Sequence, residues 1–327
     1  MNIQVIIYKI SDFVKKYVKR LYNVVKCLLL VMKLDITLGL ENLDLDNSDN
    51  IAILNLPGAP FCDHGCYGCV YEKIIEEGPD GVLDNDEIIA VIDHFADNYE
   101  TRFITINGRG DPFHPKVVES TLEKIRYGYK KGIQAYVFTA GDNLDQRVCE
   151  TLAEHEVNVM MSLFGNKLID ARFFDGREYQ GVTGEMASNF RRLIEAYPTE
   201  VTRLGMNYVV TEKDIKDPRK VMDLKKAAEA NGIYFQCNVP FGNRNQQLRH
   251  FATSFGLEHS TFVKGKCQMG AGSSVTVDYD GTLFRCPYQT GNGLGNFFEL
   301  RETGKLREVL LGLDRSYVCV VRGTKSQ

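Results

Sequence analysis

"IAILNLPGAPFCDHGCYGCVYE", residues 51–72, joins a short apolar segment to a loop that holds three cysteines. These are Cys62, Cys66 and Cys69, separated by three residues and then by two. An odd number of thiols does not make a disulfide framework, and a structural zinc site usually has two separated Cys-x-x-Cys pairs. Three thiolates suit a four-iron cluster in which one iron keeps no protein ligand. A zinc loop or a coincidental group of thiols is the alternative.

The composition bounds the class of protein. A chain of 327 residues, 44% hydrophobic and 25% charged, is long enough for one large α/β domain plus an appendage. We find no run of about 18 apolar residues that would predict a transmembrane helix, and no cleavage site of a secretory signal. We therefore expect a cytoplasmic protein with reduced thiols, in which clustered cysteines bind metal or catalyse. The net charge of −4 gives no indication of nucleic acid as a partner.

The first 50 residues are predicted to be a basic amphipathic helix and a polar linker. Residues 1–33 hold seven Lys or Arg against one acid, Asp12. Apolar residues between Ile10 and Leu28 recur at helical spacing, and the lysines lie largely off that stripe. The simpler interpretation is a helix packed on the main domain with a solvated basic face. The alternative is peripheral contact with a membrane surface or a partner protein.

Strand and helix patterns alternate from residue 51 to residue 240. The predicted strands are 51–56, 103–107, 135–139, 157–163, 204–210 and 233–239. The predicted helices are 85–99, 115–131, 143–154, 184–197 and 217–231. This alternation predicts an α/β fold with a parallel sheet and right-handed crossovers, arranged as an open, partial (β/α)6 barrel. The site of such a barrel lies at the C-terminal ends of its strands, so we expect the cysteine loop at that edge.

The chain from 241 to 327 is predicted to be a small second unit. Its composition changes to loop-like sequence, followed by short apolar segments and further cysteines. "SVTVDYDGTLFRC", residues 274–286, predicts a β-hairpin with an Asp280-Gly281 turn between alternating apolar residues.

The cysteine loop after the first strand of a partial barrel resembles the radical S-adenosylmethionine (SAM) superfamily. The resemblance covers residues 51–320. It implies that the open iron binds the amino and carboxylate groups of SAM, and that reductive cleavage gives a 5′-deoxyadenosyl radical that takes hydrogen from a substrate carbon. It also implies a reducing partner such as flavodoxin or ferredoxin. The family usually has an aromatic residue before the third cysteine. Gly68 stands there, with Tyr67 before it, and we expect the Gly68 backbone to contact the adenine.

A second segment, "NGRGDPFHP" (107–115), resembles the Gly-Gly-Glu-Pro segment that lies along the methionine amino group in this family. Gly108, Gly110, Asp111 and Pro112 match by position, with Asp in place of Glu. Glycine allows a close backbone approach to a ligand, and a carboxylate can accept a hydrogen bond from an ammonium group. A surface turn is the alternative, because Gly-Asp-Pro is common in turns.

Polar residues at later strand ends match positions where the family often contacts SAM. They are Thr139, Ser162 and Asn207. Each is equally compatible with a buried polar side chain satisfied by the backbone. Arg172 and Arg177 follow the fourth strand, where many relatives carry an arginine for the SAM carboxylate.

The C-terminal cysteines resemble the opening of the twitch and SPASM extensions, which hold an auxiliary iron–sulfur cluster. Cys267 and Cys286 have the expected spacing around Gly281, and the resemblance implies that Cys319 is a third ligand. The place of a fourth cysteine is taken by Arg322. The second cluster then has an open iron, takes a ligand from elsewhere, or is absent.

Cys237, near the end of the sixth predicted strand, has three interpretations. It is a core thiol, a ligand of the second cluster, or a catalytic hydrogen-atom donor at the barrel mouth. The resemblance as a whole predicts an enzyme that epimerises or oxidises a carbohydrate-type small molecule. The short auxiliary unit and the apparent lack of a leader-binding domain favour a small molecule. The alternatives are a maturase of ribosomally made peptides and a non-enzymatic electron-transfer or regulatory iron–sulfur protein.

Overall fold

The computed structural model describes part of the chain. It covers residues 51–58, 61–62, 64, 81–164, 170–174, 182–198, 203–238, 247–248, 250–251, 273–288, 293–312, 318–319 and 324–325. All of these belong to one compact unit, Asp44–Gln327. The predicted basic helix and several predicted site residues (Cys66, Gly68, Cys69, Arg177 and Cys267) lie outside the described residues.

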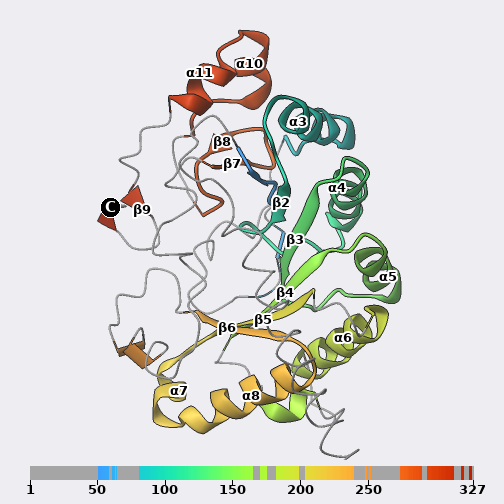
Figure 1. Cartoon of the computed structure of the whole chain (residues 1–327), viewed down its shortest axis with the longest axis vertical. Coiled ribbons are helices and arrows are strands. Elements are labelled where there is room, and N and C mark those ends of the chain that lie inside the picture. Colours follow the sequence, from blue (N-terminus) through green and yellow to red (C-terminus); the bar gives the residue numbers. More distant parts are fainter. Residues whose placement is uncertain are drawn as a thin grey trace, which may run out of the picture. The chain divides into compact units, whose positions relative to one another are not determined.

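Eight of the ten described strands form one open sheet in the order β6-β5-β4-β3-β2-β1-β7-β8 (Figure 1). The strands are β1 (Ile53–Asn55), β2 (Phe103–Ile106), β3 (Gln134–Thr139), β4 (Asn158–Phe164), β5 (Leu204–Val209), β6 (Tyr234–Asn238), β7 (Ser274–Val277) and β8 (Leu283–Phe284). Strands β1 to β7 pair in parallel, and β8 pairs antiparallel with β7. The predicted partial barrel of six β/α steps is therefore confirmed.

Helices follow the strands in the predicted places. They are α3 (Asn85–Asn98), α4 (Val118–Lys130), α5 (Gln146–Glu154), α6 (Val182–Ala196), α7 (Glu212–Lys216) and α8 (Pro218–Ala230), then α10 (Phe297–Glu302) and α11 (Leu306–Leu311). A 3-10 turn, η1 (Ala171–Phe173), and a two-stranded ribbon of β9 (Val318–Cys319) and β10 (Thr324–Lys325) complete the described elements. Local sequence sets several helix starts. Asp84 and Glu87 form a capping box on α3, and Asp145 caps α5.

The two faces of the sheet differ in chemistry. Leu163, Tyr208 and Cys237 are paired in register on neighbouring strands, and all three are fully buried in the apolar core. The Tyr208 hydroxyl donates to Asp214 Oδ1 of α7 at 2.8 Å, so this face is the one covered by helices. Successive side chains of a strand point to opposite faces. The row Ser162, Asn207 and Gln236 therefore lies on the other face, which is polar.

The C-terminal hairpin is part of the main sheet. The hairpin forms as predicted, with Gly281 at a φ of 80° in its turn. Its first strand pairs with β1, and Asn55 Nδ2 reinforces this pairing by donating to Ser274 Oγ at 2.7 Å and to the Val275 carbonyl at 2.9 Å. The division expected at residues 240 and 241 is thus not a break in the sheet.

Candidate functional site

The start of the cysteine loop is tied to the loop after β2. The Asp111 N–H donates to the Phe61 carbonyl at 3.1 Å, and the Phe61 ring stacks on His114 with 5.7 Å between ring centroids. The Lys116 ammonium lies 4.7 Å from the centre of the Phe61 ring. Cys62, the next residue, is half-buried. Phe61, directly before the first cysteine, therefore lies against the Gly-Arg-Gly-Asp-Pro loop.

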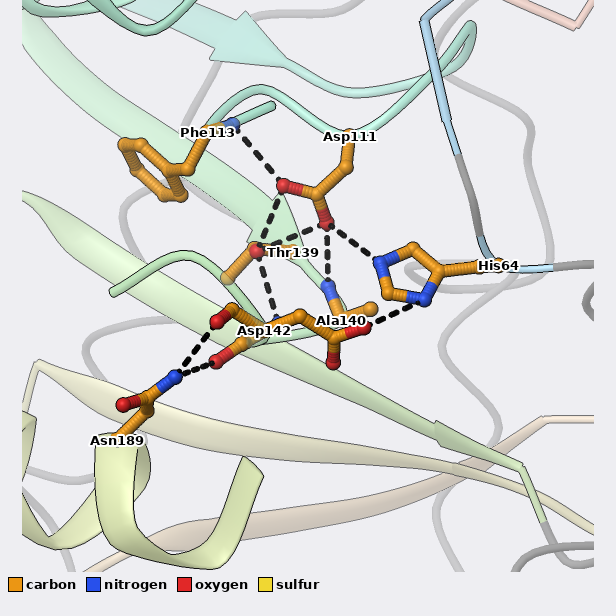
Figure 2. Close-up of polar contacts among 8 residues, drawn as sticks. His64, Asp111, Phe113, Thr139, Ala140, Asp142 and Asn189 are labelled. Atoms are coloured by element: carbon orange, nitrogen blue, oxygen red, sulfur yellow. Dashed lines mark hydrogen bonds and ion pairs between the residues drawn. The ribbon is translucent and has the colours of Figure 1, made fainter. Parts of the chain in front are cut away.

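Asp111 is a hub of hydrogen bonds between β2 and β3 (Figure 2). Its Oδ1 accepts from the Phe113 N–H at 2.9 Å, and its Oδ2 accepts from the Ala140 N–H at 2.8 Å. The Thr139 hydroxyl lies 3.1 Å and 3.0 Å from the two oxygens. Asp111 is only 3% exposed. Both oxygens have donors from the chain itself, so Asp111 fixes the loop after β2 to the end of β3, and its contact with SAM remains a prediction.

The predicted glycines adopt the backbone conformation that glycine allows. Gly108 has a φ of 106° and Gly110 a φ of 66°. A Cβ at Gly108 would lie 3.0 Å from the carbonyl oxygen of Pro287. The sequence predicts that a ligand approaches Gly108 closely. In the structure the close neighbour of Gly108 is Pro287, the residue after Cys286. Pro112 is buried in the same loop.

The later predicted residues divide between the two faces of the sheet. Asn207 Oδ1 accepts from Asn238 Nδ2 at 2.6 Å and from Gln236 Nε2 at 3.4 Å, so three amides gather on the polar face. Ser162 pairs in register with Asn207. Thr139 lies on the other face, in register with the buried Met161, and reaches Asp111 from there.

Of the three interpretations of Cys237, the structure favours the core thiol, and the catalytic role at the barrel mouth stays a prediction that this position does not support. Cys237 is fully buried beside Tyr208 on the helix-covered face, whereas its neighbours Gln236 and Asn238 are on the polar face. Burial raises the pKa of its thiol well above the ordinary value, with a further contribution from Asp214. Cys237 is a core thiol in this placement and does not meet the polar face.

Two residues that the sequence argument missed complete the site. His64, between Cys62 and Cys66 in the sequence, has its Nδ1 2.8 Å from Asp142 Oδ2 and its Nε2 3.8 Å from Asp111 Oδ2. The His64 side chain is only 6% exposed. A histidine inside the cysteine loop and an aspartate directly after the third strand were visible signals, but only the fold brings them together (Figure 2).

A small cavity opens between these residues. It measures about 200 Å³ and is lined by His64, Asp111, His114, Asp142, Asn143 and Glu185. Asp142 Oδ1 is buried, and no hydrogen-bond donor in the described part of the chain reaches it. Three of the lining residues are carboxylic acids. Such a lining suits a cationic group such as an ammonium.

A buried group of charges lies behind the loop. Arg109 Nε is 3.0 Å from Asp278 Oδ2, and the Arg109 guanidinium lies 5.5 Å from the centre of the Tyr279 ring. Burial raises the pKa of Asp278 to about 6, against the influence of Arg109. Burial lowers the pKa of Lys124 to about 8, and its ammonium donates to the Pro57 carbonyl at 3.5 Å. These contacts join the start of the cysteine loop, the loop after β2 and the C-terminal hairpin.

The described residues contain no group of three or more His, Cys, Asp or Glu side chains arranged to hold a metal ion, Cys66 and Cys69 being outside them. Of the C-terminal cysteines, Cys286 is buried at the end of the hairpin, and Cys319 is in the short strand β9. No helix in the described part of the chain is long and apolar enough to cross a membrane.

Comparisons with known proteins bear on the fold. No protein-family model and no curated protein matches the chain. Among solved structures, SuiB of Streptococcus suis bound to its precursor peptide SuiA has a TM-score of 0.57 at 12% identity, covering 82% of this chain and 67% of that one. Native anSMEcpe with bound AdoMet and a Cp18Cys peptide has a TM-score of 0.54 at 19% identity, covering 79% and 82%. Both are radical SAM enzymes. The chain has the radical SAM fold.

The radical SAM fold accounts for the open sheet and for the position of the cysteine loop after β1. The likeness is one of fold. The roles of individual residues follow from the local contacts described above.

Proposed function

We propose that the chain is a radical SAM enzyme that binds a four-iron cluster through Cys62, Cys66 and Cys69. The observation that carries the proposal is the three-cysteine loop directly after β1 of a radical SAM fold, held against the loop of Asp111. The donor set fits, because thiolates are the usual ligands of iron–sulfur clusters and three of them leave one iron open. Together, the reduced cluster and SAM supply a carbon radical that can take hydrogen from an unactivated carbon.

The cavity beside the loop also suits one group of the cofactor, its ammonium. SAM carries an ammonium group, and the cavity is lined by the acids Asp111, Asp142 and Glu185. Asp142 Oδ1 has no described hydrogen-bond donor, so it has capacity for one. Leaving a buried carboxylate oxygen unpaired is costly, and an ammonium donor would relieve that cost. Within this site Asp111 holds the ends of β2 and β3 together. Asp142 is the acid whose Oδ1 can accept a hydrogen bond from the SAM ammonium.

The test is release of 5′-deoxyadenosine. Anaerobically reconstituted protein, given dithionite and SAM, should release it, and Cys62→Ala should not. Cys149→Ala is the matched control, because Cys149 is a buried cysteine of α5 outside the site. Absence of release from the wild-type protein would favour the non-enzymatic alternative, an electron-transfer or regulatory iron–sulfur protein.

Two substrate classes follow from separate observations. The amides of Asn207, Gln236 and Asn238 on the polar face can hydrogen-bond a hydroxyl-rich molecule, which supports a carbohydrate-type substrate that is epimerised or oxidised. SuiB and anSMEcpe were both solved with peptides, which supports the peptide maturase alternative. Transfer of deuterium from a labelled candidate substrate into 5′-deoxyadenosine would choose between the classes.

A second cluster held by Cys267, Cys286 and Cys319 is part of the proposal. Reconstituted protein should then hold roughly eight irons per chain, as two four-iron clusters. A count of roughly four would leave the C-terminal cysteines empty. We also propose a flavodoxin or ferredoxin as the reducing partner, and membrane contact by residues 1–33 as a testable alternative. Binding to anionic vesicles that weakens with salt would support that contact.

A further inference from the structure

Helix α6 holds the backbone of the loop that follows β3. Asn189 Nδ2 donates to the carbonyl of Gly141 at 2.9 Å and to that of Asp142 at 2.7 Å. Arg192 Nη1 donates to the Leu144 carbonyl at 2.7 Å and to Asn189 Oδ1 at 2.8 Å. Asn189 is 7% exposed. Helix α6 therefore fixes the path of this loop through three hydrogen bonds, to the carbonyls of Gly141, Asp142 and Leu144.

The loop held in this way presents Asp142 to His64. Asp142 Oδ2 is 2.8 Å from His64 Nδ1, and an ionised carboxylate can only accept, so Nδ1 carries the proton. The other ring nitrogen faces Asp111 at 3.8 Å, which is too long for a hydrogen bond. The imidazole thus lies between acids that belong to the ends of two different strands (Figure 2).

We propose that His64 is a positioning residue for the cysteine loop, supported by Asp142 and, behind it, by Asn189. The inference rests on the proposed function. His64 lies two residues from Cys62 and two from Cys66 in the sequence. A side chain held by a charge-assisted hydrogen bond restricts the backbone at its own residue, and Cys62 is two residues away. Groups that orient metal ligands in this way commonly change metal affinity or activity when they are removed.

The experiment compares His64→Leu with His64→Asn in the reconstituted full-length protein. Leucine removes the donor to Asp142, whereas an asparagine amide places an N–H close to the position of Nδ1. The readouts are iron content, the dissociation constant of SAM and the electron paramagnetic resonance spectrum of the reduced cluster with and without SAM. We expect His64→Leu to weaken SAM binding about 10- to 100-fold and to alter the spectrum. We expect His64→Asn to restore both.

Two further variants keep the test decisive if His64→Leu folds poorly. Asp142→Leu should reproduce its effect on the spectrum and weaken SAM binding further, because Asp142 is also the proposed acceptor of the SAM ammonium. The double variant should be no worse than Asp142→Leu alone, because His64→Leu removes a contact that Asp142→Leu has already removed. Asn189→Ala, which does not touch the cysteine loop, should shift the spectrum in the same direction. His155→Leu, a histidine at the end of α5 outside the site, is the matched control.

The outcomes separate the two proposals. Wild-type protein that binds neither iron nor SAM would overturn the proposed function, and this inference with it. Wild-type protein that binds both, with His64→Leu unchanged, would overturn the positioning role alone. Strictly additive losses from His64→Leu and Asp142→Leu, or no rescue by His64→Asn, would also overturn it.

Discussion

Gly108 lies directly against Pro287, so that a Cβ at Gly108 would be 3.0 Å from the Pro287 carbonyl oxygen and 3.1 Å from its Cβ. Pro287 follows Cys286, and Gly108 begins the loop that carries Asp111. One residue further along, Arg109 reaches Asp278 of the hairpin at 3.0 Å. The C-terminal hairpin and the loop after β2 are therefore packed as one structure. A substitution in one of them should change the stability of the other.

The contact predicts that Gly108→Ala lowers the unfolding free energy more than a glycine-to-alanine change that introduces backbone strain without a clash. Gly132, after α4, has a φ of 75° and nothing within 4 Å of a Cβ, so Gly132→Ala measures the backbone strain by itself. That strain costs about 1–2 kcal/mol. Gly108→Ala adds the clash with Pro287, and we expect a total loss of about 2–4 kcal/mol in urea unfolding. Equal losses of unfolding free energy from the two variants would show that Pro287 moves away from the added methyl group at little cost.

The hydrogen bonds that Asp111 accepts predict that Asp111→Asn, a nearly isosteric substitution, lowers the stability of the fold. Asp111→Asn replaces one acceptor oxygen by an NH₂ group, which then faces the N–H of Phe113 or of Ala140. We expect a loss of about 1–3 kcal/mol in unfolding free energy, because a buried donor is left unsatisfied. Asp145→Asn is the matched control, because asparagine caps a helix as well as aspartate does.

A double-mutant cycle tests the hub itself. Thr139→Val removes the hydroxyl that donates to Asp111 and accepts from the Gly141 N–H at 3.0 Å. The losses from Asp111→Asn and Thr139→Val should be less than additive, because they share one contact. Additive losses would mean that Thr139 and Asp111 act separately.

The sequence predicted the sheet well because period-two and helical patterns are local properties. The six predicted parallel strands and the hairpin lie where the patterns place them. The face of a strand is also encoded locally: Gln236 and Asn238 are polar and alternate with Phe235 and Cys237. That alternation was the available signal that Cys237 belongs to the apolar face. The pair His64 and Asp142 could not be predicted from the pattern, because their contact depends on how α6 fixes the loop after β3.

Lys124 predicts a distinctive dependence of stability on pH. Burial lowers its pKa from the ordinary 10.5 to about 8. Between these values the unfolded chain binds a proton that the folded chain does not, so stability should rise with pH over that window. Relative to Lys124→Met, the wild-type protein should gain up to about 3 kcal/mol between pH 8 and pH 10.5.

The measurement is urea unfolding of both proteins across that range of pH. The comparison with Lys124→Met removes the effects of the other titrating groups. Lys130→Met, at an exposed lysine of the same helix, is the control and should show no such trend against the wild type. A flat difference between wild type and Lys124→Met would mean that the Lys124 ammonium is solvated in the folded protein.

The position of Cys237 predicts a thiol that is unreactive in the folded chain. It is fully buried beside Tyr208, and burial raises its pKa, so both access and thiolate formation are disfavoured. Cys62 is half-buried at the start of the cysteine loop. In iron-free, full-length protein, iodoacetamide should therefore modify Cys62 well before Cys237, as followed by mass spectrometry of the peptides. In urea the two should react at similar rates.

Under the proposed function, with the substrate on the polar face, the position of Cys237 makes a second prediction. Cys237→Ala should still cleave SAM and complete turnover, because a thiol on the helix-covered face would not reach that substrate. Rapid labelling of Cys237 in the folded protein, or loss of only the final hydrogen transfer in Cys237→Ala, would restore the donor role that the sequence suggested.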